Sequence, residues 1–214
     1  MTDLHVMATS LQPRCVQGFA RCATNSKSVE EDMIDLLEAT EEAVNEEIVA
    51  SLFDRLTDCV WTRVSIDKGD EAMRMAGIGY LARKAALNAP SKIVYSRNGV
   101  SIRTKVSVGG FLDLSETEYT VGDKKGGMRR ALGRIRVCRF IIKRGEVVAE
   151  AKVYANERDH AIGRVSYTTL GRWKVSKDGT EMVYEELTRL EEGDENRCAK
   201  VPAVASRVHF RRDS

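Results

Sequence analysis

The sequence has no run of about 18 apolar residues, so no segment reads as a membrane-spanning helix. We therefore expect a soluble protein. Hydrophobic residues make up 43% of the 214 residues, which is typical of a globular chain with a sizeable core. This length predicts one large or two small domains.

Cysteine and histidine form no pattern that would hold a metal. The five cysteines are an odd number without a close Cys-x-x-Cys pair, which argues against a disulfide framework and against a structural zinc site. The three histidines lie far apart, and no His-Glu-x-x-His spacing occurs. We predict a reducing compartment, no metal and no other cofactor.

Motifs of enzymatic catalysis are also missing. The chain has no Gly-x-Ser-x-Gly, no P-loop, no Gly-x-Gly-x-x-Gly, and no Cys/His or Asp/His pair at motif spacing. The sequence therefore predicts a binding protein and not an enzyme.

The charges are divided unevenly along the chain. Residues 28–58 hold eleven Asp or Glu against the single Arg55, whereas residues 59–214 hold 30 Lys or Arg against 20 Asp or Glu. The basic part could be attracted to anionic membranes, to nucleic acid or to the acidic segment of the same chain.

The first 57 residues read as two segments. Residues 1–27 show no sustained hydrophobic period and are predicted to be a disordered tail. Residues 28–57 are predicted to be an acidic amphipathic helical extension, because Ser28 and Glu31 form a capping-box pattern and apolar residues recur at helical intervals. We expect this extension to pack its apolar stripe on the domain and to be dispensable for the fold; a lid or a docking surface for a partner is the alternative.

A pair of short helices is predicted next, at about 69–75 and 78–88. Asp67 can cap the first helix, and Gly77 and Gly79 interrupt what would otherwise be one continuous helix. Pro90 prevents the second helix from continuing. Strands are expected after this point.

Alternation and turn signals predict antiparallel β-structure beyond Pro90. Apolar and polar residues alternate from Val100 to Val108, directly after Asn98-Gly99, which is a strong hairpin signal. Further hairpin turns are predicted at Arg144-Gly145 and at 177–179. One face of such strands is apolar and the other polar.

The order of these elements resembles the intracellular lipid-binding protein family, which comprises the fatty-acid-binding and cellular retinoid-binding proteins. The matching features are Trp61 in the opening strand, Met73-Arg74, Gly77-Ile78-Gly79-Tyr80, Arg83-Lys84, Pro90 and Ile102-Arg103-Thr104. The resemblance implies a mainly β fold: a ten-stranded antiparallel up-and-down β-barrel of the calycin, lipocalin-like type over residues 58–213. It also implies a helix-turn-helix cap on the barrel, here preceded by the N-terminal helical extension.

The resemblance also implies a site for a ligand carboxylate. Its residues are Arg172 and Arg207, with His209 at the position of the family's tyrosine. Cavity-lining positions are Ile102, Thr104, Val106 and Tyr184. The portal through which the ligand enters corresponds to Met73, Arg74, Tyr80, Arg83, Lys84 and Val108.

Alternation by itself supports a different orientation of the last strand. Val208 and Phe210 alternate with Arg207 and His209, so without the resemblance the charged side chains would be assigned to the outer face. Glu186 faces inward in the family's register and outward after a slip of one residue. The sequence leaves both alternatives open.

The resemblance implies a monomeric intracellular carrier that binds a long-chain fatty acid and moves it between membranes or to partners. It would act in the cytoplasm or the nucleus, with transient contact to anionic membranes, and a carrier of retinoic acid is the alternative ligand class. A different class, nucleic-acid or acidic-partner binding, is suggested by the basic strand region 129–144. Phe140 is the only aromatic residue there for base stacking, so we expect no nucleic-acid partner.

Overall fold

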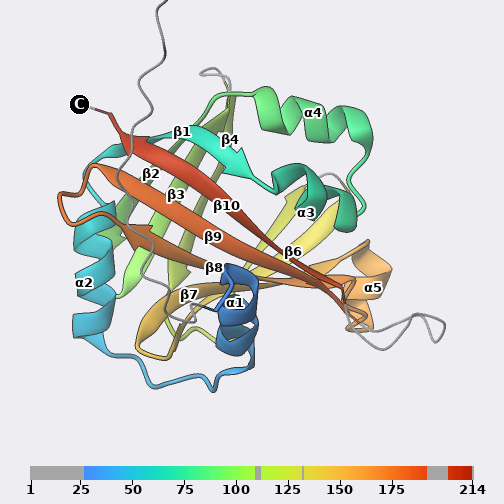
Figure 1. The fold of residues 1–214 in the computed structure, drawn as a ribbon. Helices are drawn as coiled ribbons and strands as arrows, with labels where there is room; N and C mark the ends of the chain where they lie inside the picture. Colours follow the sequence, from blue (N-terminus) through green and yellow to red (C-terminus); the bar gives the residue numbers. More distant parts are fainter. Residues whose placement is uncertain (1–26, 109–111, 132, 192–201, 214) are drawn as a thin grey trace, which may run out of the picture.

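The computed structural model describes residues 27–108, 112–131, 133–191 and 202–213. The predicted disordered tail therefore lies outside the described residues, apart from Lys27. In the described part the chain forms one ten-stranded antiparallel sheet that curls into a nearly closed barrel (Figure 1). The predicted fold class is confirmed.

The strands follow one another around the barrel in chain order. They are β1 (Val60–Asp67), β2 (Ser91–Asn98), β3 (Ser101–Val108), β4 (Leu112–Thr120), β5 (Gly127–Ala131), β6 (Arg134–Lys143), β7 (Glu146–Tyr154), β8 (Tyr167–Val175), β9 (Glu181–Leu190) and β10 (Ala203–Arg212). Closure comes from pairing of β1 with β10, and β4 and β5 are the two ends of the sheet. Beyond β4, Val121 forms a bridge with Phe140 of β6.

The tight turns lie at or next to the predicted positions. Gly99-Val100 joins β2 to β3, one residue beyond the predicted Asn98-Gly99, because Asn98 still pairs with Ser101; Gly99 has a φ of 60°. Arg144-Gly145 joins β6 to β7 with φ values of 52° and 71°, a left-handed pair that matches the twist of a two-residue hairpin. These turns fix the register of the neighbouring strands.

Helices α3 (Gly69–Met75) and α4 (Tyr80–Asn88) connect β1 to β2 and lie over one end of the barrel (Figure 1), as predicted. The prediction that Asp67 caps α3 is wrong, because Lys68 occupies the cap position in a left-handed conformation and offers no side-chain hydrogen bond. The C-terminal end of α4 is capped by Arg63, whose guanidinium donates to the carbonyls of Ala86, Leu87 and Ala89. A cation suits this end of the helix dipole.

Helix α1 (Val29–Glu38) begins at the predicted capping box, in which the backbone N–H of Glu31 donates to Ser28 Oγ and the Glu31 carboxylate accepts from the Ser28 N–H. It packs on the outside of the barrel, against β9 and β10 (Figure 1). Met33 and Leu36 are buried there in a cluster with Leu170 and Leu187. The barrel wall therefore carries apolar side chains on its outer face as well.

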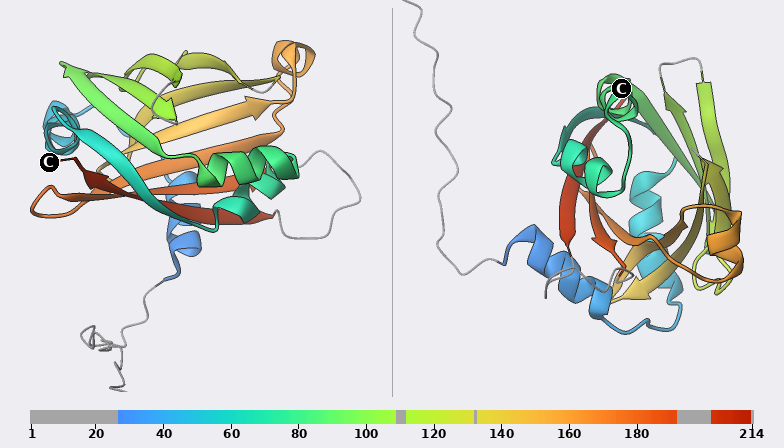
Figure 2. Two further views of the ribbon diagram at one scale, coloured as in Figure 1. Left: turned by 90° about the horizontal axis from the view of Figure 1, so that it is seen from above. Right: turned by 90° about the vertical axis from the view of Figure 1, so that its right-hand side faces the viewer.

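Helix α2 (Glu46–Leu56) lies at the end of the barrel opposite α5 (Glu157–Ala161), a one-turn helix between β7 and β8 (Figure 2, left). The side chains of Val49, Phe53 and Leu56 are fully buried and belong to the same core cluster as the inward residues of the barrel. Since the sequence led us to expect a dispensable extension, this packing leads us to expect instead that α2 stabilises the barrel. None of the described helices is long and apolar enough to cross a membrane.

Candidate functional site

The interior of the barrel is identified by the residues that share a face with Trp61, Phe140 and Met182. These three side chains are buried with α2 in one core cluster. Side chains directly opposite one another on neighbouring strands lie on the same face. Phe140 pairs with Ala149, Ala149 with Gly171, and the inward face continues to Glu186 and Ser206.

The register places Arg172, Arg207 and His209 on the outer face. Arg172 is one residue away from inward Gly171 and Trp173, and Arg207 and His209 alternate with inward Val208 and Phe210. The carboxylate site that the resemblance implies is therefore not inside the barrel. The orientation expected from alternation alone is the one observed.

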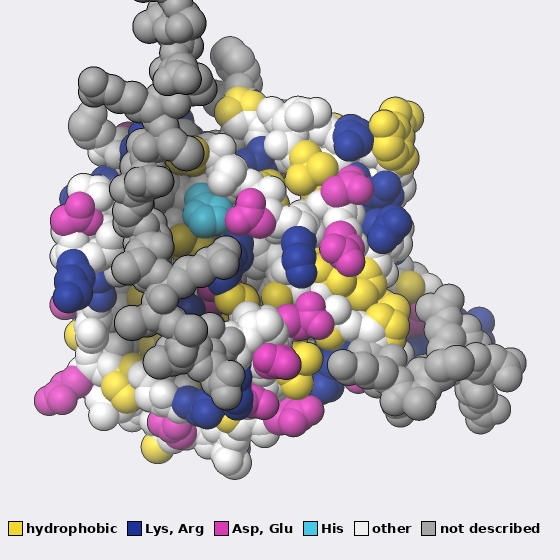
Figure 3. All heavy atoms as spheres, in the orientation of Figure 1, with side chains coloured by type: hydrophobic (Ala, Val, Ile, Leu, Met, Phe, Trp, Pro, Cys, Tyr) yellow, Lys and Arg dark blue, Asp and Glu magenta, His cyan; other side chains and the backbone are white. Residues whose placement is uncertain are grey.

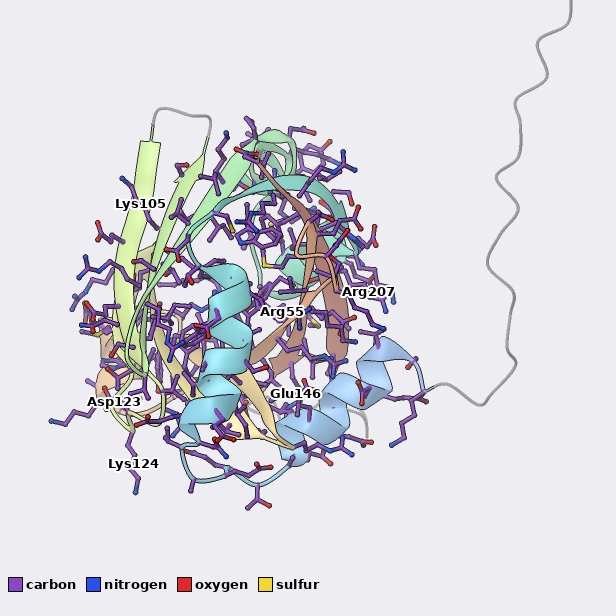
Figure 4. The ribbon with its side chains drawn as sticks, turned by 90° about the vertical axis from the view of Figure 1, so that its left-hand side faces the viewer. Arg55, Lys105, Asp123, Lys124, Glu146 and Arg207 are labelled. Atoms are coloured by element: carbon purple, nitrogen blue, oxygen red, sulfur yellow. The ribbon has the colours of Figure 1, made fainter. Side chains whose placement is uncertain are left out.

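Both outer arginines bind a carboxylate of the protein itself. The Nε atoms of Arg172 and Arg207 donate to Glu185 at 2.9 and 3.1 Å, and Lys174 Nζ lies 3.1 Å from the same carboxylate. Arg172 Nη2 also donates to Asp32 of α1 at 2.6 Å. Figure 4 shows Arg207 at the outside of the barrel, near α1.

This cluster holds its carboxylates in the charged form. Burial acts to raise the pKa of Glu185, but the hydrogen bonds and charges of Lys174 and Arg172 outweigh it, so the pKa is lowered. The pKa of Asp32 is lowered by its hydrogen bond to Arg172. On the face of the molecule that carries α1 and β10, acidic and basic side chains are mixed (Figure 3). The group formed by Arg172, Arg207, Lys174, Glu185 and Asp32 therefore attaches α1 to the outside of the barrel.

His209 takes part in a separate contact, because its Nε2 lies 3.1 Å from Asp67 Oδ2. Next to it, a surface cavity of about 450 Å³ lies between the start of α1 and β10. Arg207, Lys68, Asp67 and Glu30 contribute charged side chains of both signs to its lining. Its mixed charge offers no net attraction for an anion.

A different group of polar side chains lies inside the barrel. Arg136, Cys138 and Phe140 occupy alternate positions of β6. Because Cys138 and Phe140 face inward, Arg136 does too. Its Nη2 donates to Thr169 Oγ1 at 3.2 Å and to Glu186 Oε1 at 3.3 Å. Although it faces inward, 41% of the Arg136 side chain is exposed. Solvent therefore reaches this guanidinium within the barrel.

The pKa values of Arg136 and its neighbours are shifted by burial and by nearby charges. Burial acts to lower the pKa of Arg136, but the nearby Glu186 carboxylate and the Tyr184 phenol raise it above its usual value. Burial raises the pKa of Cys138 to about 11 and raises that of Tyr184 well above its usual value. At neutral pH the group thus consists of a permanent cation, one carboxylate and neutral hydroxyls. Such a group can receive the polar end of an otherwise apolar ligand.

The predicted cavity-lining residues share this inward face. Thr104 and Val106 alternate with Ile102 on β3, and Ile102 is fully buried in the core cluster. Tyr184 belongs to an aromatic group on the same face. Its ring centroid lies 5.2 Å from that of Trp173, which stacks on Phe140 at 5.4 Å and donates a hydrogen bond to the Tyr95 hydroxyl at 3.0 Å. These rings fill much of the half of the barrel nearest α2.

The predicted portal residues lie on α3, on α4 and at the end of β3. Arg83 Nε donates to Asp70 Oδ1 at 3.0 Å and so ties α4 to α3. Arg83 and Lys84 both lie over the ring of Tyr80, at 5.8 and 5.6 Å from its centroid. Met73 and Arg74 are on α3, and Val108 is the last residue of β3.

Apolar side chains are exposed beside these cations. Tyr80 is 62% and Leu81 81% exposed. Hydrophobic and basic side chains lie together where α4 begins (Figure 3).

The basic region 129–144 does not form one continuous basic surface. Its outward side chains are neutralised: Arg130 pairs with Glu157 at 2.7 Å, and Arg139 pairs with Glu150 at 2.6 Å. Lys143 is buried and donates to the Leu37 carbonyl. Arg144 is exposed in the turn after β6, and Arg129, Arg134 and Arg136 face the barrel interior, so the arrangement does not favour a nucleic-acid surface.

In the described part of the chain, no three His, Cys, Asp or Glu side chains come together in a way that could hold a metal ion. The polar group inside the barrel contains hydroxyls, guanidinium groups and one carboxylate. Guanidinium groups cannot ligate a cation. The site is suited to an anion.

No protein-family model matches the sequence. No curated protein matches it either. Solved structures do match. A fatty acid transporter, REP1-NXSQ, superposes with a TM-score of 0.51 at 16% identity, over 73% of this chain and 95% of that chain. The fatty-acid-binding protein of Manduca sexta gives 0.52 at 13%, over 73% and 98%.

The chain has the fold of the fatty-acid-binding proteins. A third match is the fatty-acid-binding protein of Schistosoma mansoni in complex with arachidonic acid, with a TM-score of 0.50 at 12% identity over 76% of this chain and 98% of that chain. At such identities the likeness establishes the shared barrel and carries no residue roles.

Sequence reasoning identified Glu186 as a potential inward carboxylate but missed Arg136 as its partner. A signal was present, because Arg136, Cys138, Phe140 and Ile142 lie at alternate positions of one strand. Three apolar members of this series predict an inward face that includes the arginine.

Proposed function

We propose that the protein is a carrier that binds a long-chain fatty acid inside its barrel, with the carboxylate at Arg136. The observation that supports this most is a solvent-reachable guanidinium on the inward face of the barrel, beside the buried apolar core cluster. Burial of an acyl chain contributes about 0.8 kcal/mol per CH₂ group, and a guanidinium meets a carboxylate in two parallel hydrogen bonds. The neighbouring Thr169 hydroxyl supplies a further donor.

The internal Glu186 sets a condition on binding. Its carboxylate already accepts from Arg136 at 3.3 Å, which is a long hydrogen bond. A ligand carboxylate that approaches Arg136 competes with Glu186, and the outcome depends on the other cations nearby. Retinoic acid presents the same kind of head group and is the alternative ligand, to be distinguished by competition between the two acids.

The fold and the portal support the carrier role. The solved structures with this fold include a fatty acid transporter and a fatty-acid-binding protein in complex with arachidonic acid. The exposed Tyr80 and Leu81 of α4, beside Lys84, suit brief contact with an anionic membrane during transfer. We place this activity in the cytoplasm, with the protein acting as a monomer.

The test compares Arg136→Gln with Arg207→Gln by titration calorimetry, using a fatty acid and the corresponding alcohol. Arg136→Gln should weaken binding of the acid by ~1.5–3 kcal/mol, the range for a hydrogen bond to a charged group, and leave the alcohol nearly unchanged. Arg207→Gln should change neither, since that side chain lies outside. If only Arg207→Gln weakens the acid, the interior assignment is wrong.

A further inference from the structure

More positive charge lies inside the barrel than a single carboxylate ligand can neutralise. Arg129 of β5 pairs directly with Arg136 of β6, so both side chains leave the sheet on its inward side. Gly127, two residues before Arg129, confirms this face, because a Cβ built there would meet the Tyr119 ring at 2.9 Å. Arg134 precedes Arg136 by two residues and lies on the same face.

The partners of these three arginines can be followed one by one. Arg136 donates hydrogen bonds to Glu186 and Thr169. Arg134 lies over the Tyr167 ring at 5.7 Å, with its Nη2 3.4 Å from the Gly77 carbonyl in the turn between α3 and α4. Among the described residues, Arg129 has neither a hydrogen bond nor an ion pair. Three positive charges therefore face one carboxylate.

Other inward charges do not alter this balance. Arg63 is bound to the carbonyls at the end of α4, and Arg97 pairs with Asp54 of α2 at the far end of the barrel. On β7, β8 and β10 the inward positions are apolar residues, hydroxyl residues or glycine. The arginine group therefore has an excess of two positive charges beneath α3 and α4.

Like charges directly opposite one another on neighbouring strands destabilise a sheet. An anion between them removes that repulsion, and a tetrahedral phosphate offers oxygens to two guanidinium groups at once, each in a fork geometry. A carboxylate carries one charge and leaves an excess cation. A phosphate monoester carries nearly two charges at neutral pH.

We propose that the head group bound between Arg129 and Arg136 is doubly charged, and that the preferred ligand is a phosphate monoester of a long-chain alcohol. This inference rests on the proposed function, because it assumes that the alkyl chain enters the barrel. The two proposals differ in the chemistry of the head group.

The test measures binding of dodecyl phosphate, its monomethyl ester and dodecanoate by titration calorimetry at pH 7.5, below their micellar concentrations. The ester keeps the tail and the tetrahedral head but carries a single charge. Dodecyl phosphate should bind about tenfold more tightly than either of the others, since it alone neutralises both excess charges. The preference over the ester should shrink at pH 5, because the second phosphate proton dissociates near pH 6.

The ester also controls for titration of the protein. Glu186 is the carboxylate that faces Arg136, and its influence acts on both ligands. Arg129→Gln should reduce the preference for dodecyl phosphate to less than about threefold. Arg130→Gln is the matched control, because the adjacent side chain points outward to Glu157 and should leave the preference intact.

The outcomes separate the two proposals. Equal affinity for dodecyl phosphate and dodecanoate in the unmodified protein overturns the doubly charged head group and leaves the carrier function standing. If none of the three ligands shows saturable binding, the proposed function fails as well. The comparison of ligands at two pH values needs no substitution, so it decides the matter even where Arg129→Gln does not fold.

Discussion

Glu185 lies between Arg172 and Arg207 on the outer face, and its carboxylate accepts a hydrogen bond from each of them. Two arginines thus share one carboxylate, as the family resemblance implies, but that carboxylate belongs to the protein itself and not to a ligand. Glu185 is 2% exposed and Arg172 4%. The group contributes to the attachment of α1 and is unavailable to a ligand in the barrel.

Glu185→Gln should lower the free energy of unfolding by about 3 kcal/mol, because removal of one partner leaves the buried Arg172 charge poorly compensated. Urea unfolding followed by circular dichroism measures the change. Glu181→Gln, on the same strand but 65% exposed, is the control and should cost less than about 0.5 kcal/mol. Equal effects of the two substitutions would contradict the role given to Glu185.

Asp32→Asn should destabilise the protein by ~1 kcal/mol or less, since the Asp32 side chain is 38% exposed and solvent screens its pair with Arg172. The pKa of Asp32 is lowered by the Arg172 hydrogen bond, so its stabilisation is present above the unfolded pKa of about 4 and is lost as the pH falls through the lower folded value. The difference between the variant and the unmodified protein should therefore be largest near pH 7 and disappear once the pH is below the lowered folded pKa. Asp35→Asn, one turn along α1 and paired with Lys27, should show a smaller difference at pH 7.

Phe53→Ala should cost about 3–5 kcal/mol, the range for a large aromatic side chain removed from a core. Ser51→Ala, exposed on the same helix, should be nearly neutral.

A chain that begins at Ala50 loses Val49 and the first turn of α2, and we expect it to unfold at a lower urea concentration. A truncated chain as stable as the full one would show that α2 is an accessory to the barrel.

Lys84→Glu should slow transfer of a bound fluorescent fatty acid to anionic vesicles, and the effect should fade at high salt, because screening shortens the reach of surface charge to a few ångströms at about 1 M. Lys177→Glu makes the same charge change in the hairpin between β8 and β9 and should leave the rate unaltered. Equal slowing by both variants would mean that net charge, and not α4, determines transfer.

The sequence predicted the larger features of the fold because they depend on local signals. Gly99 and Arg144-Gly145 have left-handed backbone, and the helical pair before Pro90 is bounded by glycine and proline. The orientation of Arg172 and Arg207 depended instead on a resemblance, and a shift of one residue moves every side chain to the other face. Alternation with Val208 and Phe210 gave the correct face for Arg207.

The position of α2 could not be predicted in the same way. Its apolar stripe is visible in the sequence, but the residues that cover it, such as Phe140 and Met182, lie some 90 and 130 positions further along the chain. A stripe shows that a helix is buried on one side and does not name its partner. The ion pair of Arg136 with Glu186 could not be predicted for the same reason, since 50 residues separate the two.

The pairing of β1 with β10 gives the protein a particular order of assembly. During synthesis Val60–Asp67 emerges long before its partner Ala203–Arg212. Until then the edge of β1 is open, and the apolar side chains that will face the barrel are exposed to other chains. Contacts between such distant segments also slow folding. The nascent chain is therefore most vulnerable to aggregation just before β10 appears, and a chaperone that covers β1 during that interval should raise the yield of folded protein.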